Sequence, residues 1–408
     1  MSDQAAPISS LKSLQLDLPP SCVEFCPAFP SYFVVGTYNL QKDEDASGTE
    51  GENDTGPKTQ NRNGSLVVFR VDGQELVQLQ VLPQPSALLD LRFSPHPGQQ
   101  HICVAVSSTA TISMFSLSGN DDDPLEETGT ATMSMLTKGA RESESGLLFL
   151  AFAWHPSRKD TIAVSTSEGG IHLVHLGGSS NDWAMSVNPV LTHSLEAWCV
   201  TIHAPLDIQE ESRPFMVFSG GDDSNLFYTT CTDTDLTERD ADEDEDEPRT
   251  THRIRGHEAG VTAILPLDSN LDPDLQLVVT GSYDDHIRLF GVGHAGIGGS
   301  RLLAERHLGG GVWRLKVVKV DRVGGAGWRM TILASCMHAG VRIVELSKSV
   351  EGVYGFRTLA SFVEHQSMNY GSDFQPGSEE DLVVVSTSFY DKLLCLWRFS
   401  NHGGKDGI

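Results

Sequence analysis

The sequence lacks the segments that would place the chain in or across a membrane. Its longest apolar run, LLFLAFAW at 147–154, is far short of the ~20 residues that a membrane span requires. The N-terminal residues MSDQAAPISS have no apolar core of the kind that a secretory signal contains. The seven cysteines include no Cys-x-x-Cys pair, and their odd number favours reduced thiols. We therefore expect a cytoplasmic protein without membrane contact.

Positive charge is also scarce. The chain has 29 Lys and Arg residues against 55 Asp and Glu residues, which gives a net charge of −26. Phosphate binding requires the opposite balance, so nucleic acid is disfavoured as a direct ligand. Much of the acidity lies in two stretches, 41–63 and 232–249, which are predicted to be disordered insertions. They would serve either solubility or the docking of a basic partner.

Familiar catalytic motifs are missing too. The sequence contains no Gly-x-Ser-x-Gly elbow, no His-Glu-x-x-His and no phosphate-binding P-loop. His and Asp residues are scattered, which leaves metal-dependent hydrolysis open, but no spacing typical of metal ligands supports it. Neither a metal nor a cofactor is expected. What the chain does contain is 39 glycines and many short apolar runs, a composition typical of short strands joined by turns.

The clearest pattern lies at 256–292. Three apolar runs of strand length follow one another there, with turn residues between them, and Gly256-His257 stands at the front. Ser282-x-Asp284 precedes the last run, which is typical of a WD-repeat blade, although Phe290 stands where the motif has Trp. In such a blade, His257 is expected to bond Asp284 and fix one strand pair to the next. A single blade cannot bury both faces of its sheet, so the pattern predicts further copies.

Six more segments match it. The third strand of each copy is predicted to contain one apolar anchor; the seven anchors are Leu66, Ile112, Ile171, Leu226, Ile287, Val341 and Leu393. Successive anchors are 46 to 61 residues apart, more than the ~40–45 residues usual for a blade, so some loops must be enlarged. The prediction is an all-β, seven-bladed WD-repeat β-propeller that occupies 1–408 as a single domain.

The ring must close, because unpaired strand edges invite aggregation. The residues after the last predicted strand, SNHGGKDGI, are too polar and glycine-rich to supply a fourth strand. Residues 10–18, in contrast, alternate leucine with polar residues before a Pro-Pro stop. This segment is predicted to be the closing strand of the last blade.

Candidate binding residues lie on the rim where first strands begin. Trp198, Trp313 and Tyr370 fall near the starts of first strands in blades four, six and seven. Their rings either pack between blades or share the channel mouth. In the second case they could form an aromatic cage for a quaternary ammonium group, with ~0.5–2 kcal/mol of cation–π attraction.

Candidate catalytic residues gather in blade seven. Within eleven residues of loop and strand start lie Glu364, His365, Ser367, Asn369, Tyr370 and Asp373. A histidine beside a carboxylate there could activate water or the Ser367 hydroxyl. Strand alternation would send some of these side chains to opposite faces. In the turns of the last two blades, His338 and Tyr390 replace the aspartate found in blade five, either by decay of the repeat or for function.

In these repeat and rim segments the chain resembles the WD-repeat family of diphthine methyl ester hydrolases, called diphthine methyltransferases in older naming. The most specific matches are GGGVWRL, MHAGVRIVEL, EHQSMNYGSDF and SFYDKLLCLWRF, and the resemblance covers nearly the whole chain apart from the acidic insertions.

The resemblance implies that the chain removes a methyl ester from over-methylated diphthine on a histidine of translation elongation factor 2, a step of diphthamide biosynthesis. The modified side chain carries a trimethylammonium group near the ester, which suits an aromatic cage. In this hypothesis the catalytic candidates are His365, His338, Ser367 and Glu364. The candidates for substrate binding are Trp198, Trp313, Tyr370, Asn369, Tyr390 and Glu196. Backbone amides of 309–311 could stabilise the oxyanion.

A different class of function stays open. Most WD-repeat rings bind proteins and perform no chemistry, so a non-catalytic interaction adaptor is the alternative. An adaptor of a ubiquitin ligase would need a helical docking extension, and the sequence shows none. In either reading we expect a monomer whose main partner is a protein.

Overall fold

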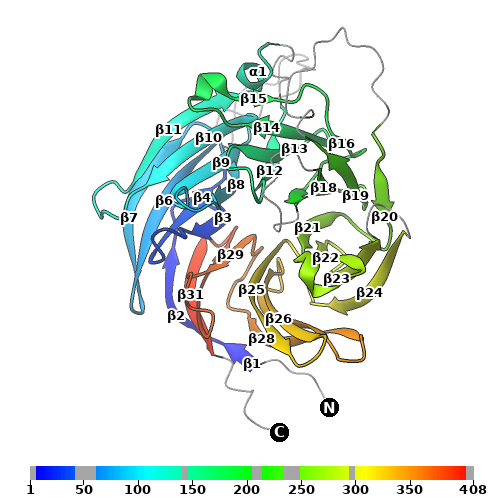
Figure 1. Cartoon of the computed structure of the whole chain (residues 1–408). Helices are drawn as coiled ribbons and strands as arrows, with labels where there is room; N and C mark the ends of the chain where they lie inside the picture. Colours follow the sequence, from blue (N-terminus) through cyan, green and yellow to red (C-terminus); the bar gives the residue numbers. More distant parts are fainter. Residues whose placement is uncertain are drawn as a thin grey trace, which may run out of the picture.

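Seven β-sheets stand in a ring (Figure 1). The computed structural model describes residues 6–41, 61–139, 146–204, 214–232, 235, 249–293 and 299–400. The seven predicted anchors all lie in the third strands of successive sheets. The predicted seven-bladed β-propeller is therefore confirmed.

The first three blades follow one another from the N-terminal side. Blade one contains β3 (Pro20–Phe25), β4 (Tyr32–Thr37), β6 (Arg62–Asp72) and β7 (Glu75–Gln84), with the short β5 (Asn39–Leu40) beside β6. Blade two contains β8 (Leu88–Phe93), β9 (Ile102–Ser107), β10 (Thr111–Leu117) and β11 (Leu125–Thr132), and α1 (Met133–Leu136) follows it. Blade three contains β12 (Phe149–Trp154), β13 (Thr161–Thr166), β14 (Gly170–His175), β15 (Ala184–Met185) and β16 (Leu191–Thr192).

Four more blades complete the circle. Blade four contains β17 (Cys199–His203), β18 (Phe215–Gly220), β19 (Leu226–Cys231) and β20 (His252–Ile254). Blade five contains β21 (Val261–Pro266), β22 (Leu275–Ser282), β23 (His286–Gly293) and β24 (Ser300–His307). Blade six contains β25 (Arg314–Val323), β26 (Gly327–Ser335), β27 (Val341–Lys348) and β28 (Tyr354–Phe362). Blade seven contains β29 (Gly371–Phe374), β30 (Asp381–Ser388) and β31 (Leu393–Ser400).

The core lies between the blades rather than inside any one of them. Seven clusters of buried apolar side chains each join one blade to the next around the ring. The middle strands are accordingly buried on both faces, as in β4 and β13, where all six residues are buried. The outer strand β24 begins with three exposed residues. Among the described residues, no helix is both long and apolar enough to cross a membrane.

The N-terminal segment contributes strands to two blades. The strand β1 (Ala6–Ile8) pairs in parallel with β28 of blade six, and β2 (Ser10–Gln15) pairs antiparallel with β31 of blade seven. Leu16 then packs in the apolar cluster that joins blade seven to blade one. The sheet of blade seven thus combines an N-terminal strand with three C-terminal ones, and the pairing of β1 was not foreseen from the sequence.

The acidic insertions fall largely on residues that the structure does not describe, at 42–60, 233–234 and 236–248. One boundary needs correction. Arg62 and Asn63 were assigned to the first insertion, but they begin β6, and Asn63 pairs with Asn39 of β5. The apolar run within β6 begins only at Leu66, so the polar residues at the start of the strand were predicted to be loop.

Substitutions in the N-terminal segment test how it stabilises the ring. Leu16 is 7% exposed, whereas Leu11 is 39% exposed. We expect Leu16→Ala to lower the free energy of unfolding by about 2–5 kcal/mol, because it opens a cavity between blades seven and one. Leu11→Ala should change it by less than about 0.5 kcal/mol. Urea denaturation followed by tryptophan fluorescence measures both; equal effects would show that burial of Leu16 does not hold the junction.

Candidate functional site

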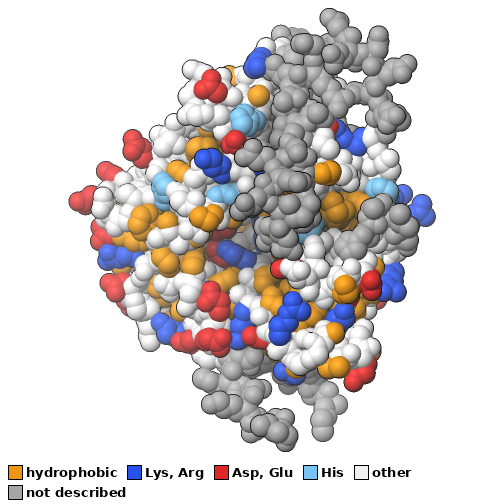
Figure 2. All heavy atoms as spheres, in the orientation of Figure 1, with side chains coloured by type: hydrophobic (Ala, Val, Ile, Leu, Met, Phe, Trp, Pro, Cys, Tyr) orange, Lys and Arg blue, Asp and Glu red, His pale blue; other side chains and the backbone are white. Residues whose placement is uncertain are grey.

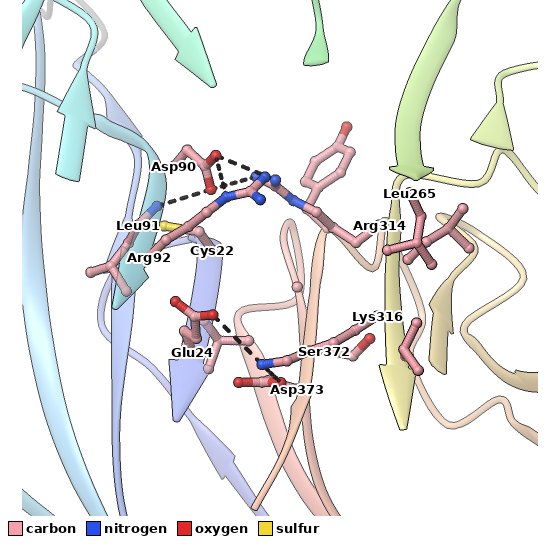
Figure 3. A pocket seen from close by; sticks show the side chains of 15 residues that line it. Cys22, Glu24, Asp90, Leu91, Arg92, Leu265, Arg314, Lys316, Ser372 and Asp373 are labelled. Atoms are coloured by element: carbon pink, nitrogen blue, oxygen red, sulfur yellow. Dashed lines mark hydrogen bonds and ion pairs between the residues drawn. The ribbon is translucent and has the colours of Figure 1, made fainter. Parts of the chain in front are cut away.

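The innermost strands of five blades line a cavity of about 280 Å³ at the centre of the ring. Figure 2 shows basic side chains at the hollow in the middle of this face, and Figure 3 shows the cavity from close by. Six charged side chains line it, namely Glu24, Asp90, Arg92, Arg314, Lys316 and Asp373. They come from β3, β8, β25 and β29, strands that are far apart in the sequence.

Two arginines share one buried carboxylate in this cavity. Arg314 Nη2 lies 2.8 Å from Asp90 Oδ1, and Arg92 Nε lies 3.2 Å from Asp90 Oδ2 (Figure 3). Burial alone would raise the pKa of Asp90, but the charges of Arg314 and Arg92 outweigh it, and the pKa is lowered. Asp90 is therefore a fixed anion that holds both guanidinium groups in place.

A second cluster joins blades one, six and seven. Lys316 Nζ lies 2.6 Å from Asp373 Oδ1 and 3.5 Å from Glu24 Oε1, so the amine stands between two carboxylates (Figure 3). Burial alone would lower the pKa of Lys316, but Asp373 and Glu24 outweigh it and raise the pKa. The lysine is therefore a permanent cation at neutral pH.

Glu24 differs from Asp90 in its ionisation. Burial raises the pKa of Glu24 to about 7; Lys316 opposes this rise and Asp373 adds to it. A carboxyl group that titrates near neutral pH can both accept and return a proton under working conditions. The cavity thus combines fixed cations with one group suited to proton transfer.

The three aromatic residues predicted for the channel mouth do come together. The ring centroids of Trp198 and Trp313 are 5.8 Å apart, and those of Trp313 and Tyr370 are 5.0 Å apart. All three side chains are partly exposed. Tyr370 also lines the cavity, so the aromatic group and the charged cavity adjoin each other.

Two further rings extend this group, and the sequence analysis missed them. The ring of Tyr283 lies 6.0 Å from Trp313 and 6.3 Å from Trp198, and Phe389 lies 5.5 Å from Tyr370. We call these five side chains, Trp198, Tyr283, Trp313, Tyr370 and Phe389, the aromatic arc. Tyr283 and Phe389 sit in the loops that join second to third strands, in GSYDDH and TSFYDK. An aromatic residue at the same loop position in two blades was the available signal.

Trp198 is fixed by a polar contact at its edge. Its Nε1 donates to Asp222 Oδ1 at 3.1 Å, which leaves the indole face free to pack on its neighbours. Burial raises the pKa of Tyr283 well above its usual value, so the phenol stays neutral. The arc thus presents π faces without a formal charge of its own.

The structure places His365 in the body of blade seven. Its side chain is buried, and Nε2 lies 2.7 Å from Ser386 Oγ, which accepts a hydrogen bond from Trp397 Nε1 at 2.9 Å. Burial lowers the pKa of His365 to about 4, so the ring is neutral at pH 7. His365 therefore joins strands within one blade. Its hydrogen-bond partner is Ser386, not Ser367.

Equivalent histidines occupy the same position in two other blades. His193 Nε2 lies 2.8 Å from Ser219 Oγ, and His257 Nε2 lies 2.9 Å from Thr280 Oγ1. The predicted bond from His257 to Asp284 was wrong: His257 Nδ1 has no hydrogen-bond partner among the described residues, and Asp284 instead binds Arg288 at 2.8 Å. His257 nevertheless joins neighbouring strands, as expected, through its hydrogen bond with the Thr280 hydroxyl.

The other blade-seven candidates point in different directions. Ser367 Oγ donates to Asp391 Oδ1 at 2.7 Å, in the turn after β30. Glu364 Oε1 accepts a hydrogen bond from the backbone N–H of Ser10, in the N-terminal segment, at 3.1 Å. Asn369 is fully buried, and its amide donates to the backbone oxygens of two neighbouring residues. The structure therefore does not bring Glu364, His365 and Ser367 together as one catalytic group.

The remaining candidates are rim residues. His338 is exposed in the turn between β26 and β27, and Tyr390 is 70% exposed beside Phe389, with ring centroids 5.1 Å apart. Glu196 is partly buried near Trp198, and its backbone oxygen accepts from Asp222 N at 2.9 Å. Tyr390 and Glu196 lie beside the arc, and none of the three side chains lines the charged cavity.

Of the six charged residues of the cavity, the sequence analysis named only Asp373, and the cavity itself was not predicted. Its residues interrupt the otherwise apolar first strands of their blades, as in CVEF at 22–25, LDLRF at 89–93 and WRLKV at 313–317. Charges inside a strand that must be buried were the available signal. Within the described residues no three His, Cys, Asp or Glu side chains form a group that could hold a metal ion.

Comparison with known proteins gives one consistent result. Residues 248–290 match the family model described as WD domain, G-beta repeat. A protein of Schizosaccharomyces pombe named diphthine methyltransferase is 26% identical over 384 residues, 93% of this chain and 95% of that protein. The Saccharomyces cerevisiae protein of that name is 25% identical and covers 95% of this chain; the human one is 24% identical and covers 90%. The whole-length resemblance stated from the sequence is thus confirmed.

The buried histidine of blade seven predicts a pH dependence of stability. Because the pKa of His365 falls from 6.5 to about 4 on folding, the unfolded chain binds a proton that the folded chain does not between these values. Stability is therefore lost as pH falls through this window, by up to about 1.4 kcal/mol per pH unit. We expect His365→Gln to reduce this slope in urea denaturations between about pH 6.5 and 4.5.

His338→Gln serves as the matched control. Its side chain is exposed in the folded protein, so folding changes its surroundings little. The control should keep the slope of the unsubstituted protein. An unchanged slope in His365→Gln would show that the buried ring does not set the acid limit of blade seven.

Proposed function

We propose that this chain hydrolyses the methyl ester of over-methylated diphthine on translation elongation factor 2, giving diphthine and methanol in diphthamide biosynthesis. The observation that carries the proposal is the position of Tyr370, which belongs to the aromatic arc and also lines the charged cavity. A site for a quaternary ammonium group and a site for ester chemistry therefore adjoin each other. Similarity to proteins named diphthine methyltransferase supports the same assignment.

The aromatic arc suits the trimethylammonium group of the substrate. A quaternary ammonium ion has no hydrogen to donate, so it binds through the π faces of aromatic rings. Trp198, Trp313 and Tyr370 offer such faces from three blades, with centroid distances of 5.0 to 5.8 Å between neighbouring rings. The ester, attached near the ammonium group, would then enter the cavity below.

The charges in the cavity favour hydrolysis over methyl transfer. Attack of water on an ester builds negative charge on the carbonyl oxygen, and fixed cations stabilise that charge. Lys316 and Arg314 supply such cations, and Glu24 can accept the proton of the water. Transfer of a methyl cation to a carboxylate would instead neutralise charge, and cations beside the acceptor would oppose it.

The substrate protein would dock on the face around the arc. The rim residues Tyr390, His338 and Glu196 are proposed to contact elongation factor 2; Tyr390 and His338 are exposed, and Glu196 is partly buried. Because the factor works in translation, the site of action would be the cytoplasm.

A mass measurement tests the activity. Purified protein is incubated with elongation factor 2 that carries methyl-esterified diphthine, and the modified peptide is then weighed. We expect the peptide to lose the mass of one CH2 group while methanol appears in equal amount. Unesterified diphthine should stay unchanged under the same conditions. Stable binding of the factor without loss of mass would favour the non-catalytic adaptor instead.

Substitution of Trp313 tests the aromatic arc. Trp313→Phe keeps a π face, whereas Trp313→Leu keeps apolar volume without one. Loss of a cation–π contact of ~0.5–2 kcal/mol predicts that KM rises roughly 2- to 30-fold in Trp313→Leu and much less in Trp313→Phe. Steady-state kinetics of methanol release give both values. If the two variants have the same KM, the ring does not bind the ammonium group.

A further inference from the structure

The three carboxylates that line the cavity differ in how many of their lone pairs are occupied. Asp90 is 2% exposed, and its oxygens accept from Arg314, Arg92 and two backbone amides. Asp373 is 1% exposed and is held by Lys316 and one backbone amide. Neither carboxylate has an oxygen that is open to a reactant.

Glu24 is the exception of the three. Its side chain is 21% exposed. Oε2 accepts from the backbone N–H of Phe93 at 2.6 Å, which fixes the carboxylate. Oε1 lies 3.5 Å from Lys316 Nζ, beyond an ordinary N–H···O hydrogen bond, so a water molecule in the cavity can bind it.

Lys316 complements this oxygen. Its side chain is 40% exposed, and an ammonium group has three N–H donors. One donor faces Asp373 at 2.6 Å, which leaves donors for an oxygen in the cavity. An ester carbonyl placed against Lys316 would therefore bring its carbon next to a water held by Glu24.

We infer that Glu24 is the general base of the reaction proposed above and that Lys316 binds the ester carbonyl oxygen; the assignment rests on that proposed function. Glu24 takes a proton from water as the water oxygen bonds to the ester carbon, and Lys316 stabilises the oxyanion. The carbon–methoxy bond then breaks, and the leaving oxygen takes the proton back from Glu24. The products are methanol and the carboxylic acid, which loses its proton to solvent.

The surroundings of Glu24 set the working pH. The groups that face it are Lys316 on β25, Asp373 on β29, Arg92 on β8 and the thiols of Cys26 and Cys103. Burial raises the pKa of Glu24 to about 7. A general base must be unprotonated, so kcat should fall as pH drops below about 7 and level off above it.

The test compares two glutamates that each face a lysine. Glu24→Gln keeps the shape and the hydrogen bond to Phe93 but cannot accept a proton. We expect kcat for methanol release to fall ~10²- to 10⁴-fold with KM changed little, and the inflection near pH 7 to disappear. Glu380 lies 3.1 Å from Lys319 but is 88% exposed, so Glu380→Gln is the matched control and should keep the rate. Glu24→Asp, which retains a carboxylate, should keep a pH-dependent residual rate.

Each outcome decides the assignment. Full activity in Glu24→Gln, or an unchanged pH profile, would overturn the role of Glu24 while leaving the ester hydrolysis intact. No loss of mass with the unsubstituted protein would overturn the hydrolysis and this assignment together. Should Glu24→Gln fail to fold, the unsubstituted protein still decides, because a kcat that stays flat between roughly pH 6 and 8 is incompatible with this base.

Discussion

The structure depends on the burial of apolar side chains between neighbouring sheets. A single sheet cannot bury its own apolar faces. Each face is buried against the neighbouring blade, in clusters such as the one that joins Phe33 and Phe69 to Val385 and Leu396. Stability of this kind is distributed around a circle. Opening one junction exposes two apolar faces, so the junction between blades seven and one is as necessary as the other six.

This constraint explains how the chain ends are used. The N-terminal segment pairs with blade six through β1 and with blade seven through β2, then enters blade one at β3. This segment therefore connects blade seven to blade one. Without it, only side-chain packing would join these two blades. Backbone hydrogen bonds add directional contacts there, and Glu364 reinforces them by binding Ser10. A residue that resembled a catalytic acid in sequence thus acts at the seam of the ring.

The sequence predicts repeats well because each blade must satisfy the same burial pattern, and all seven third strands were found through one apolar anchor each. It predicts the aromatic arc in part, since Trp198, Trp313 and Tyr370 precede first strands at equivalent places. Residues close together in the sequence did not form a catalytic group. His365 and Ser367 are two residues apart, yet one bonds Ser386 inside the blade and the other bonds Asp391 in a turn. The cavity could not be assembled from sequence, because Glu24, Asp90 and Lys316 meet only after the ring closes.

The charge balance of the cavity connects the fold to the proposed reaction. Three acids and three bases line it in a chain whose net charge is −26. When Glu24 holds the proton of the attacking water, one positive charge in the cavity is left uncompensated, at the moment when the ester oxygen becomes an anion. When the proton leaves with methanol, Glu24 is negative again and repels the new carboxylate of the product. The same group would thus favour the charged intermediate and disfavour the product, which is the behaviour that turnover requires.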